Sequence, residues 1–168
     1  LTQGKPVVTD VLPAEGISAE RLLRVAASLE QGASHPLAEA IVSHAKKQDI
    51  ALSQPASLRA VPGKGLLATL EGSDHALGSP GFLAEQGVVI PQALLAPLAG
   101  AGKSVVGVSQ GLTLLGLLGV ADPLRPTSRA AVARLKAQGV EVVMLTGDNA
   151  ATAAAIAREA GIERYEAE

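Results

Sequence analysis

The stretch Val140-Glu141-Val142-Val143-Met144-Leu145-Thr146-Gly147-Asp148-Asn149 decides how the C-terminal part of the chain folds. The apolar run 140–145 predicts a continuous buried strand, and the polar turn 146–149 follows it directly. A helix begun by Thr127 or Ser128 and closed by Gly139 is expected before the strand, and another helix is expected after the turn, ending near Gly161. Helix, buried strand, turn and helix are typical of a doubly wound parallel sheet, whose ligands bind at the carboxyl ends of the strands.

A proline-rich stretch, Asp122-Pro123-Leu124-Arg125-Pro126, comes before these elements and cannot continue a strand. We therefore place a domain boundary there, and residues 121–168 form a partial Rossmann-like α/β unit. In its first helix, Ala131, Val132 and Leu135 are expected to face the core.

The preceding residues predict a different architecture. A helix beginning at Ser18 carries apolar residues at i, i+3, i+4 and i+7 and ends near Gly32, and Pro36 begins a second helix that runs to Lys47. Period-two alternation predicts a hairpin over 66–70 and 75–77, and strands are expected at 104–108 and 112–120. Short helices are expected at 82–86 and at 92–95, the latter interrupted by Pro97. The pattern indicates an α+β fold, an antiparallel sheet flanked by helices.

The composition excludes several classes of function. Hydrophobic residues make up 48% of the 168, which is enough to bury a core, and the formal charge is −2 with no basic run. One Phe, one Tyr and no Trp leave little aromatic surface for stacking bases, so nucleic acid is not expected as a partner. The absence of cysteine excludes thiolate metal sites and fits a reducing compartment. The most apolar run, 112–121, is too short to cross a bilayer, and residues 1–5 do not resemble a signal peptide.

Two constellations suggest recognition of a nucleotide base. Glu30 and His35 lie at the end of one helix and the start of the next, where an imidazole can lie against a purine while a carboxylate accepts from its amino group. The alternative is a surface histidine at a helix start. Gly63 and Gly65 would allow close approach of a ligand to the backbone, or they would simply form a turn or a bulge.

Polar side chains in the C-terminal part suggest phosphate chemistry. Thr146 and Asp148 follow a strand and precede a helix, where phosphate and magnesium could bind, although a plain helix cap would use the same residues. Asp122 and Arg125 could equally form a turn with an exposed ion pair. No role is assigned to His44 or His75, because neither has a partner at the spacing of metal ligands.

Together the motifs resemble the heavy-metal group of P-type ATPases, and the resemblance covers essentially the whole chain. Leu1-Thr2 resembles the end of the family motif DKTGTLT, Ser34-His35-Pro36-Leu37 its SxHPL motif, and Gly63 and Gly65 its paired glycines. The 122–126 stretch resembles the hinge motif, and Thr146-Gly147-Asp148 resembles TGD.

The resemblance implies a nucleotide-binding domain over 8–120, preceded by the start of the phosphorylation domain and hinge at 1–7 and followed by a partial phosphorylation domain of the haloacid-dehalogenase type at 121–168. It implies ATP and Mg²⁺ as cofactors. Glu30, His35, Gly63, Gly65, Leu66 and Ser79 would contact ATP, and Thr146, Asp148 and Asp122 would support catalysis. Gly78-Ser79 departs from the Gly-Asn that the family often has, which puts one contact in doubt. No residue is assigned as a metal ligand.

The resemblance also implies where such a chain works. The phosphorylated aspartate is expected before Leu1 and the GDGxND motif after Glu168, so the isolated chain is expected to bind ATP without hydrolysing it. We expect a cytoplasmic segment of a plasma-membrane pump that has the rest of the pump as its partner. Copper is favoured over zinc as cargo because 62–65 and 161–168 look closer to copper pumps. The alternatives are a fragment of a haloacid-dehalogenase-type phosphatase, disfavoured because no DxD motif occurs, and a regulatory module without nucleotide binding.

Overall fold

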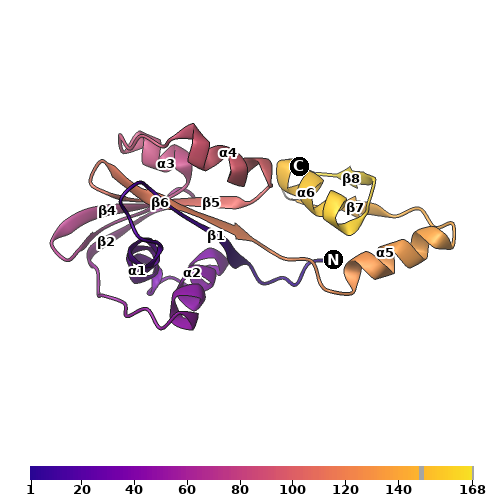
Figure 1. Ribbon diagram of the computed structural model, residues 1–168, viewed down its shortest axis with the longest axis horizontal. Coiled ribbons are helices and arrows are strands. Elements are labelled where there is room, and N and C mark those ends of the chain that lie inside the picture. Colours follow the sequence, from indigo (N-terminus) through magenta and orange to yellow (C-terminus); the bar gives the residue numbers. More distant parts are fainter. Residues whose placement is uncertain (148–149, 168) are drawn as a thin grey trace.

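A six-stranded sheet forms the larger part of the molecule (Figure 1). The computed structural model describes residues 1–147 and 150–167. The strands lie in the order β1-β6-β5-β4-β3-β2, and every neighbouring pair is antiparallel. Their bounds are β1 Val7–Pro13, β2 Ala56–Val61, β3 Gly65–Leu70, β4 Ser73–Gly78, β5 Ser104–Gln110 and β6 Thr113–Ala121. The predicted antiparallel sheet is confirmed.

Helices cover both faces of this sheet (Figure 1). The pair α1 (Ala19–Glu30) and α2 (Pro36–Lys47) packs on one face, and α3 (Pro80–Glu85) and α4 (Gln92–Gly100) pack on the other. Each face has its own hydrophobic cluster; Leu22, Leu29, Ile41 and Leu118 belong to the first, and Phe82, Leu83, Leu98 and Leu117 to the second. The sheet is thus buried on both sides by aliphatic residues, with one Phe among them.

Two local details differ from the sequence prediction. Strand β1 was not predicted, because a register shift between Val8 and Asp10 interrupts its alternation. Helix α4 continues through Pro97 to Gly100 instead of ending before it. The proline removes a hydrogen bond to the carbonyl of Ala93, but Ala93 is exposed, so water can satisfy that carbonyl.

The C-terminal unit, residues 122–167 as described, contains α5 (Ser128–Ala137), β7 (Val143–Leu145), α6 (Ala150–Ala160) and β8 (Arg164–Glu166). Strands β7 and β8 pair in parallel, as an α/β unit requires. The prediction of a continuous buried strand at 140–145 is wrong, because β7 has three residues and Leu145 is 74% exposed. Strand β8 was not predicted. Among the described residues, β8 is the only strand that pairs with β7, so little of β7 is enclosed.

Helix α5 also buries less than its pattern predicts. Val132 packs with Met144 in the unit's small cluster, but Ala131 and Leu135 are exposed, contrary to expectation. Neither Thr127 nor Ser128 caps the helix through its side chain, since the Ser128 hydroxyl instead donates to the Leu1 carbonyl at 2.6 Å. The N-terminal segment therefore engages the hydroxyl that could otherwise have served as a local cap.

Two chain segments run side by side between the sheet and the C-terminal unit. Thr2 pairs with Leu124 in an isolated bridge, and Arg125 Nε donates to the Thr2 carbonyl at 2.8 Å. The Asp122 carboxylate accepts from the amides of Gly4 and Lys5 at 3.0 and 3.2 Å. Asp122 and Arg125 form no ion pair with each other in the part of the chain that is described, so the exposed pair considered from sequence is absent.

No helix within residues 1–147 and 150–167 is long and apolar enough to cross a bilayer.

Candidate functional site

A cleft of about 950 Å³ lies where the α1–α2 turn, the β2–β3 turn, the start of α3 and the start of α6 meet. It is lined by residues of both units, among them Glu30, His35, Gly63, Lys64, Gly65, Ser79, Gly102, Lys103, Ala151 and Thr152. Five of the six residues predicted to contact ATP therefore share one cavity. Their roles in binding stay predictions.

Glu30 is the most unusual residue of the cleft. Its side chain is only 4% exposed, and its Oε2 atom has no hydrogen-bond partner within the described structure. Burial raises the pKa of Glu30, and the nearby His35 ring opposes this rise. A buried carboxylate oxygen without a partner costs free energy, so a ligand with a hydrogen-bond donor would find a ready acceptor here.

His35 faces Glu30 from the start of α2. Its Nε2 lies 3.4 Å from Oε2 of Glu30, and its side chain is 53% exposed. The other ring nitrogen, Nδ1, accepts a hydrogen bond from the amide of Ala38 at 3.2 Å, so His35 is the N-cap of α2. The sequence alternative of a histidine at a helix start is therefore correct in structure, and the same ring also faces the cleft.

The two glycines of the β2–β3 turn have different structural roles. Gly63 has φ +72, and the amide of Lys64 donates to the Val61 carbonyl, so Pro62-Gly63 occupies the centre of a turn that requires positive φ at its third residue. A Cβ on Gly63 would meet no atom within 4 Å. A Cβ on Gly65 would lie 2.2 Å from the Leu77 carbonyl oxygen, so Gly65 is required by the close approach of β3 and β4.

Ser79 and Leu66 complete the predicted set. Ser79 lines the cleft, but its hydroxyl accepts from the amide of Phe82 at 3.2 Å and caps α3. Leu66 is buried in the cluster under α1 and α2 and is not among the residues that line the cleft.

Two lysines line the same cleft and were not found by sequence reasoning. Lys64 pairs with Glu85 at 2.7 Å, and Lys103 pairs with Asp10. Burial would raise the pKa of Asp10, but hydrogen bonds from Lys103 and Thr9 outweigh burial and lower it. Isolated lysines carry no periodic signal, and only the fold brings these two together. They make the cleft a suitable place for a polyanionic ligand.

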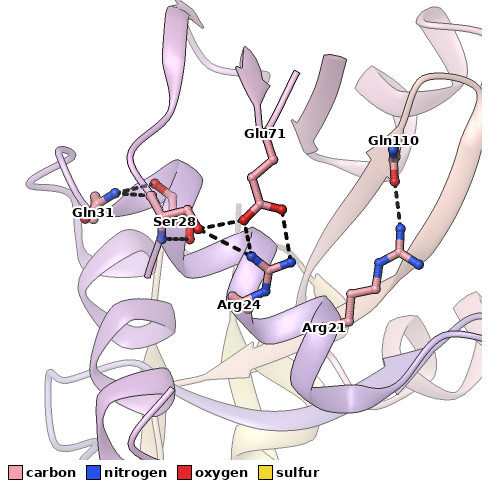
Figure 2. Close-up of polar contacts among 7 residues, drawn as sticks. Arg21, Arg24, Ser28, Gln31, Glu71 and Gln110 are labelled. Carbon is pink, nitrogen blue, oxygen red and sulfur yellow. Dashed lines mark hydrogen bonds and ion pairs between the residues drawn. The ribbon is translucent and has the colours of Figure 1, made fainter. Parts of the chain in front are cut away.

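Helix α1, which carries Glu30, is tied to neighbouring segments by a polar network (Figure 2). Arg24 bonds to the Glu71 carboxylate, and the hydroxyl of Ser53 donates to the same carboxylate at 2.8 Å. Ser28 accepts from the Ser53 amide at 3.0 Å, and Gln31 donates to the Ser53 carbonyl at 2.7 Å. The loop before β2 is thus tied to the C-terminal half of α1, where Glu30 lies.

Thr146 and Asp122, two of the predicted supporting residues, are not among the described residues that line this cleft. The Thr146 amide donates to the Glu166 carbonyl at 3.0 Å, which places Thr146 at the end of β7, and Asp148 lies outside the described residues. Asp122 holds the two linking segments together. No group of three or more His, Asp or Glu side chains within 1–147 and 150–167 is arranged to hold a metal ion.

The two histidines without an assigned role lie elsewhere. His44 contacts Gln48, the residue that follows α2, and its ring Nε2 atom lies 2.9 Å from the side-chain amide nitrogen of Gln48. His75 is 6% exposed, its Nδ1 lies 2.9 Å from the Ser73 carbonyl, and burial lowers its pKa. His75 is not among the residues that line the cleft.

A family model described as haloacid dehalogenase-like hydrolase matches residues 1–168. The chain belongs to the haloacid dehalogenase-like hydrolases.

Within the haloacid dehalogenase-like hydrolases, the chain is similar to heavy-metal P-type ATPases along its whole length. It is 41% identical over 171 residues to the copper-transporting P-type ATPase of Rhizobium leguminosarum bv. viciae, covering 100% of this chain and 20% of that protein. It is 42% identical over 163 residues to the zinc/cadmium/lead-transporting P-type ATPase of Shigella sonnei, covering 97% and 22%. The crystal structure of a zinc-transporting PIB-type ATPase in the E2.Pi state matches with a TM-score of 0.89, 41% identity, and coverage of 99% of this chain and 27% of that one.

These similarities agree with the predicted resemblance to a segment of the heavy-metal P-type ATPases. The chain spans about a fifth of the length of the curated relatives it matches. Relatives named for copper and for zinc are almost equally identical to it, so the similarity does not distinguish the transported ion.

Proposed function

We propose that the cleft binds ATP and that the chain is the ATP-binding segment of a heavy-metal-translocating P-type ATPase, on the cytoplasmic side of the membrane. The observation that carries this proposal is the Glu30 carboxylate, which is buried in the cleft wall with one oxygen unpartnered. The amino group of adenine is a donor that this oxygen can accept from.

The other cleft residues suit the remaining parts of ATP. The His35 ring is half-exposed and can lie against the purine, while the turn at Gly63 leaves open space for close approach. Lys64 and Lys103 supply positive charge for the phosphates. Mg²⁺ enters this proposal as the counterion of the substrate ATP. The γ-phosphate would then be presented to an aspartate of the pump, with the chain acting by positioning.

A titration with ATP followed by NMR tests the proposal. Chemical-shift changes should cluster at Glu30, His35, Gly63 and Gly65, while the amide of Glu141, which does not line the cleft, should not move. GTP should bind more weakly, because its carbonyl would face the Glu30 carboxylate. Absence of any saturable shift with ATP would reject the proposal and favour a regulatory module without nucleotide binding.

We further propose Cu(I) as the cargo, on the resemblance of 62–65 and 161–168 to copper pumps. The test is ATP hydrolysis by the full-length protein with each ion in turn. Stimulation by Cu(I) and not Zn(II) is expected, and stimulation by Zn(II) alone would reject this assignment.

A further inference from the structure

His35 makes two contacts, one through each nitrogen of its ring. Nδ1 accepts from the Ala38 amide, and a nitrogen that accepts from an N–H group cannot itself carry a proton. The proton of the neutral ring must then be on Nε2, the nitrogen that lies 3.4 Å from Glu30. The helix cap and the proton position are thus linked.

We propose that His35 is a positioning residue: its cap to α2 fixes the Nε2–H tautomer and so places the ring proton on the nitrogen 3.4 Å from Glu30 Oε2, where it attracts the carboxylate without satisfying that oxygen by a hydrogen bond. The proposal concerns the ligand-free cleft, and it rests on the proposed function only for its effect on ATP. It assigns to the SxHP-like segment a role in arranging the acceptor, in addition to any contact with a base.

The surroundings of the pair support this assignment. Glu30 is the only carboxylate among the described residues that line the cleft, and the two lysines there are already paired, Lys64 with Glu85 of α3 and Lys103 with Asp10 of β1. Glu39, one turn into α2, is exposed. His35 is therefore the one group within ion-pair distance of Glu30 in the described structure. Pro36 at the first helical position fixes the backbone from which the ring projects.

The tautomer can be observed directly by long-range ¹H–¹⁵N correlation spectra of the imidazole in the ligand-free chain at pH 7.5. We expect Nε2 to carry the proton and Nδ1 to show the shift of an unprotonated acceptor. A protonated Nδ1 would overturn the proposal, whatever the affinity for ATP.

Two variants separate the cap from the contact with Glu30. His35→Asn keeps a good N-cap residue but has no Nε2–H, whereas His35→Ala loses both. Hydrogen exchange at the Ala38 amide should become about fivefold faster in His35→Ala and stay near the original rate in His35→Asn. The pKa of Glu30, followed by carboxyl ¹³C shifts, should rise in both variants because the opposing influence of His35 is lost.

Ser18→Ala is the matched control, because Ser18 caps α1 by accepting from the Arg21 amide at 3.1 Å, away from the cleft. It should weaken protection at the start of α1 and leave Ala38 and the pKa of Glu30 unchanged. An unmoved Glu30 pKa in both His35 variants would overturn the positioning role. ATP titrations of the same variants separate the two proposals: failure of all of them, original chain included, to bind ATP would reject the proposed function and leave the tautomer result standing.

Discussion

Replacing Glu30 by glutamine should make the fold more stable and the binding of ATP weaker. The side chain is 4% exposed and its Oε2 has no partner, and such unsatisfied buried groups cost roughly 1–3 kcal/mol. Glu30→Gln preserves the shape and removes the charge, so it should recover part of this cost, about 1 kcal/mol at neutral pH. That corresponds to a melting temperature about 2–4 °C higher for a chain of this size. ATP affinity should fall about tenfold, because a charged acceptor is replaced by a neutral amide.

The pH dependence of the stability difference between Glu30→Gln and the original chain tests whether the buried charge of Glu30 causes it. Burial raises the pKa of Glu30, and His35 only opposes the rise, so the folded chain binds this proton more tightly than the unfolded chain does. The destabilisation by ionised Glu30 is therefore complete above the raised pKa and is relieved as the pH falls through it. The stability gained in Glu30→Gln should be largest at pH 8 and shrink toward pH 5.

Urea unfolding at pH 8, 6.5 and 5, paired with calorimetric titration of ATP, measures both quantities. Glu20→Gln, at an exposed position in the first turn of the same helix, is the matched control and should change neither by much. A Glu30→Gln chain that is less stable than the original at pH 8, or a stability difference independent of pH, would show that Glu30 is held by contacts that outweigh its burial. The argument for an acceptor awaiting a ligand would then be refuted.

Three further substitutions test other parts of the structure. Gly65→Ala should lower the free energy of unfolding in urea by about 1–3 kcal/mol, because the new Cβ would collide with backbone. Gly63→Ala meets open space and should lower it by about 1 kcal/mol for its positive φ alone. Equal losses in the two variants would contradict this difference. Asp122→Ala should speed hydrogen exchange at the Lys5 amide several-fold, and unchanged exchange would show that the carboxylate does not hold the two linking segments together. Because burial lowers the pKa of His75, stability should fall as the pH drops below about 6.5, and His75→Gln should reduce that fall in urea titrations; an identical pH profile would exclude His75 as its source.

The sequence predicts those elements whose signals are local. Ser18 accepts from the Arg21 amide, and Pro36 sits at the first helical position, so the starts of α1 and α2 follow from caps that the chain itself displays. Strand β1 escaped prediction because its register shift breaks the alternation, and β7 proved shorter and more exposed than its apolar run suggests. Apolar composition tells which residues can be buried, but neighbouring strands and helices decide which of them are.

The residues of the candidate site likewise divide into those that the sequence predicts and those that only the fold brings together. Glu30 and His35 are close in sequence, so the helix-turn-helix pattern suffices to bring them to one side. Lys103 reaches the same cleft from the start of β5, and Thr152 reaches it from α6, where its hydroxyl donates to the Gly102 carbonyl at 2.8 Å. Such partners depend on strand order and on how the two units meet, and neither can be worked out from spacing along the chain.

The paired glycines show why the case for a ligand depends on Glu30. Gly63 is explained by the turn, and Gly65 by the close approach of β3 to β4, where a Cβ would also crowd the Phe82 ring at 2.8 Å. Both would be needed in a chain that binds nothing, so neither is evidence of binding by itself. A carboxylate in a cleft wall with an unpartnered oxygen is different, because an uncharged residue of similar shape would be less costly to bury. Retaining such a residue is physically reasonable only if something with a hydrogen-bond donor occupies the cleft for part of the protein's working cycle.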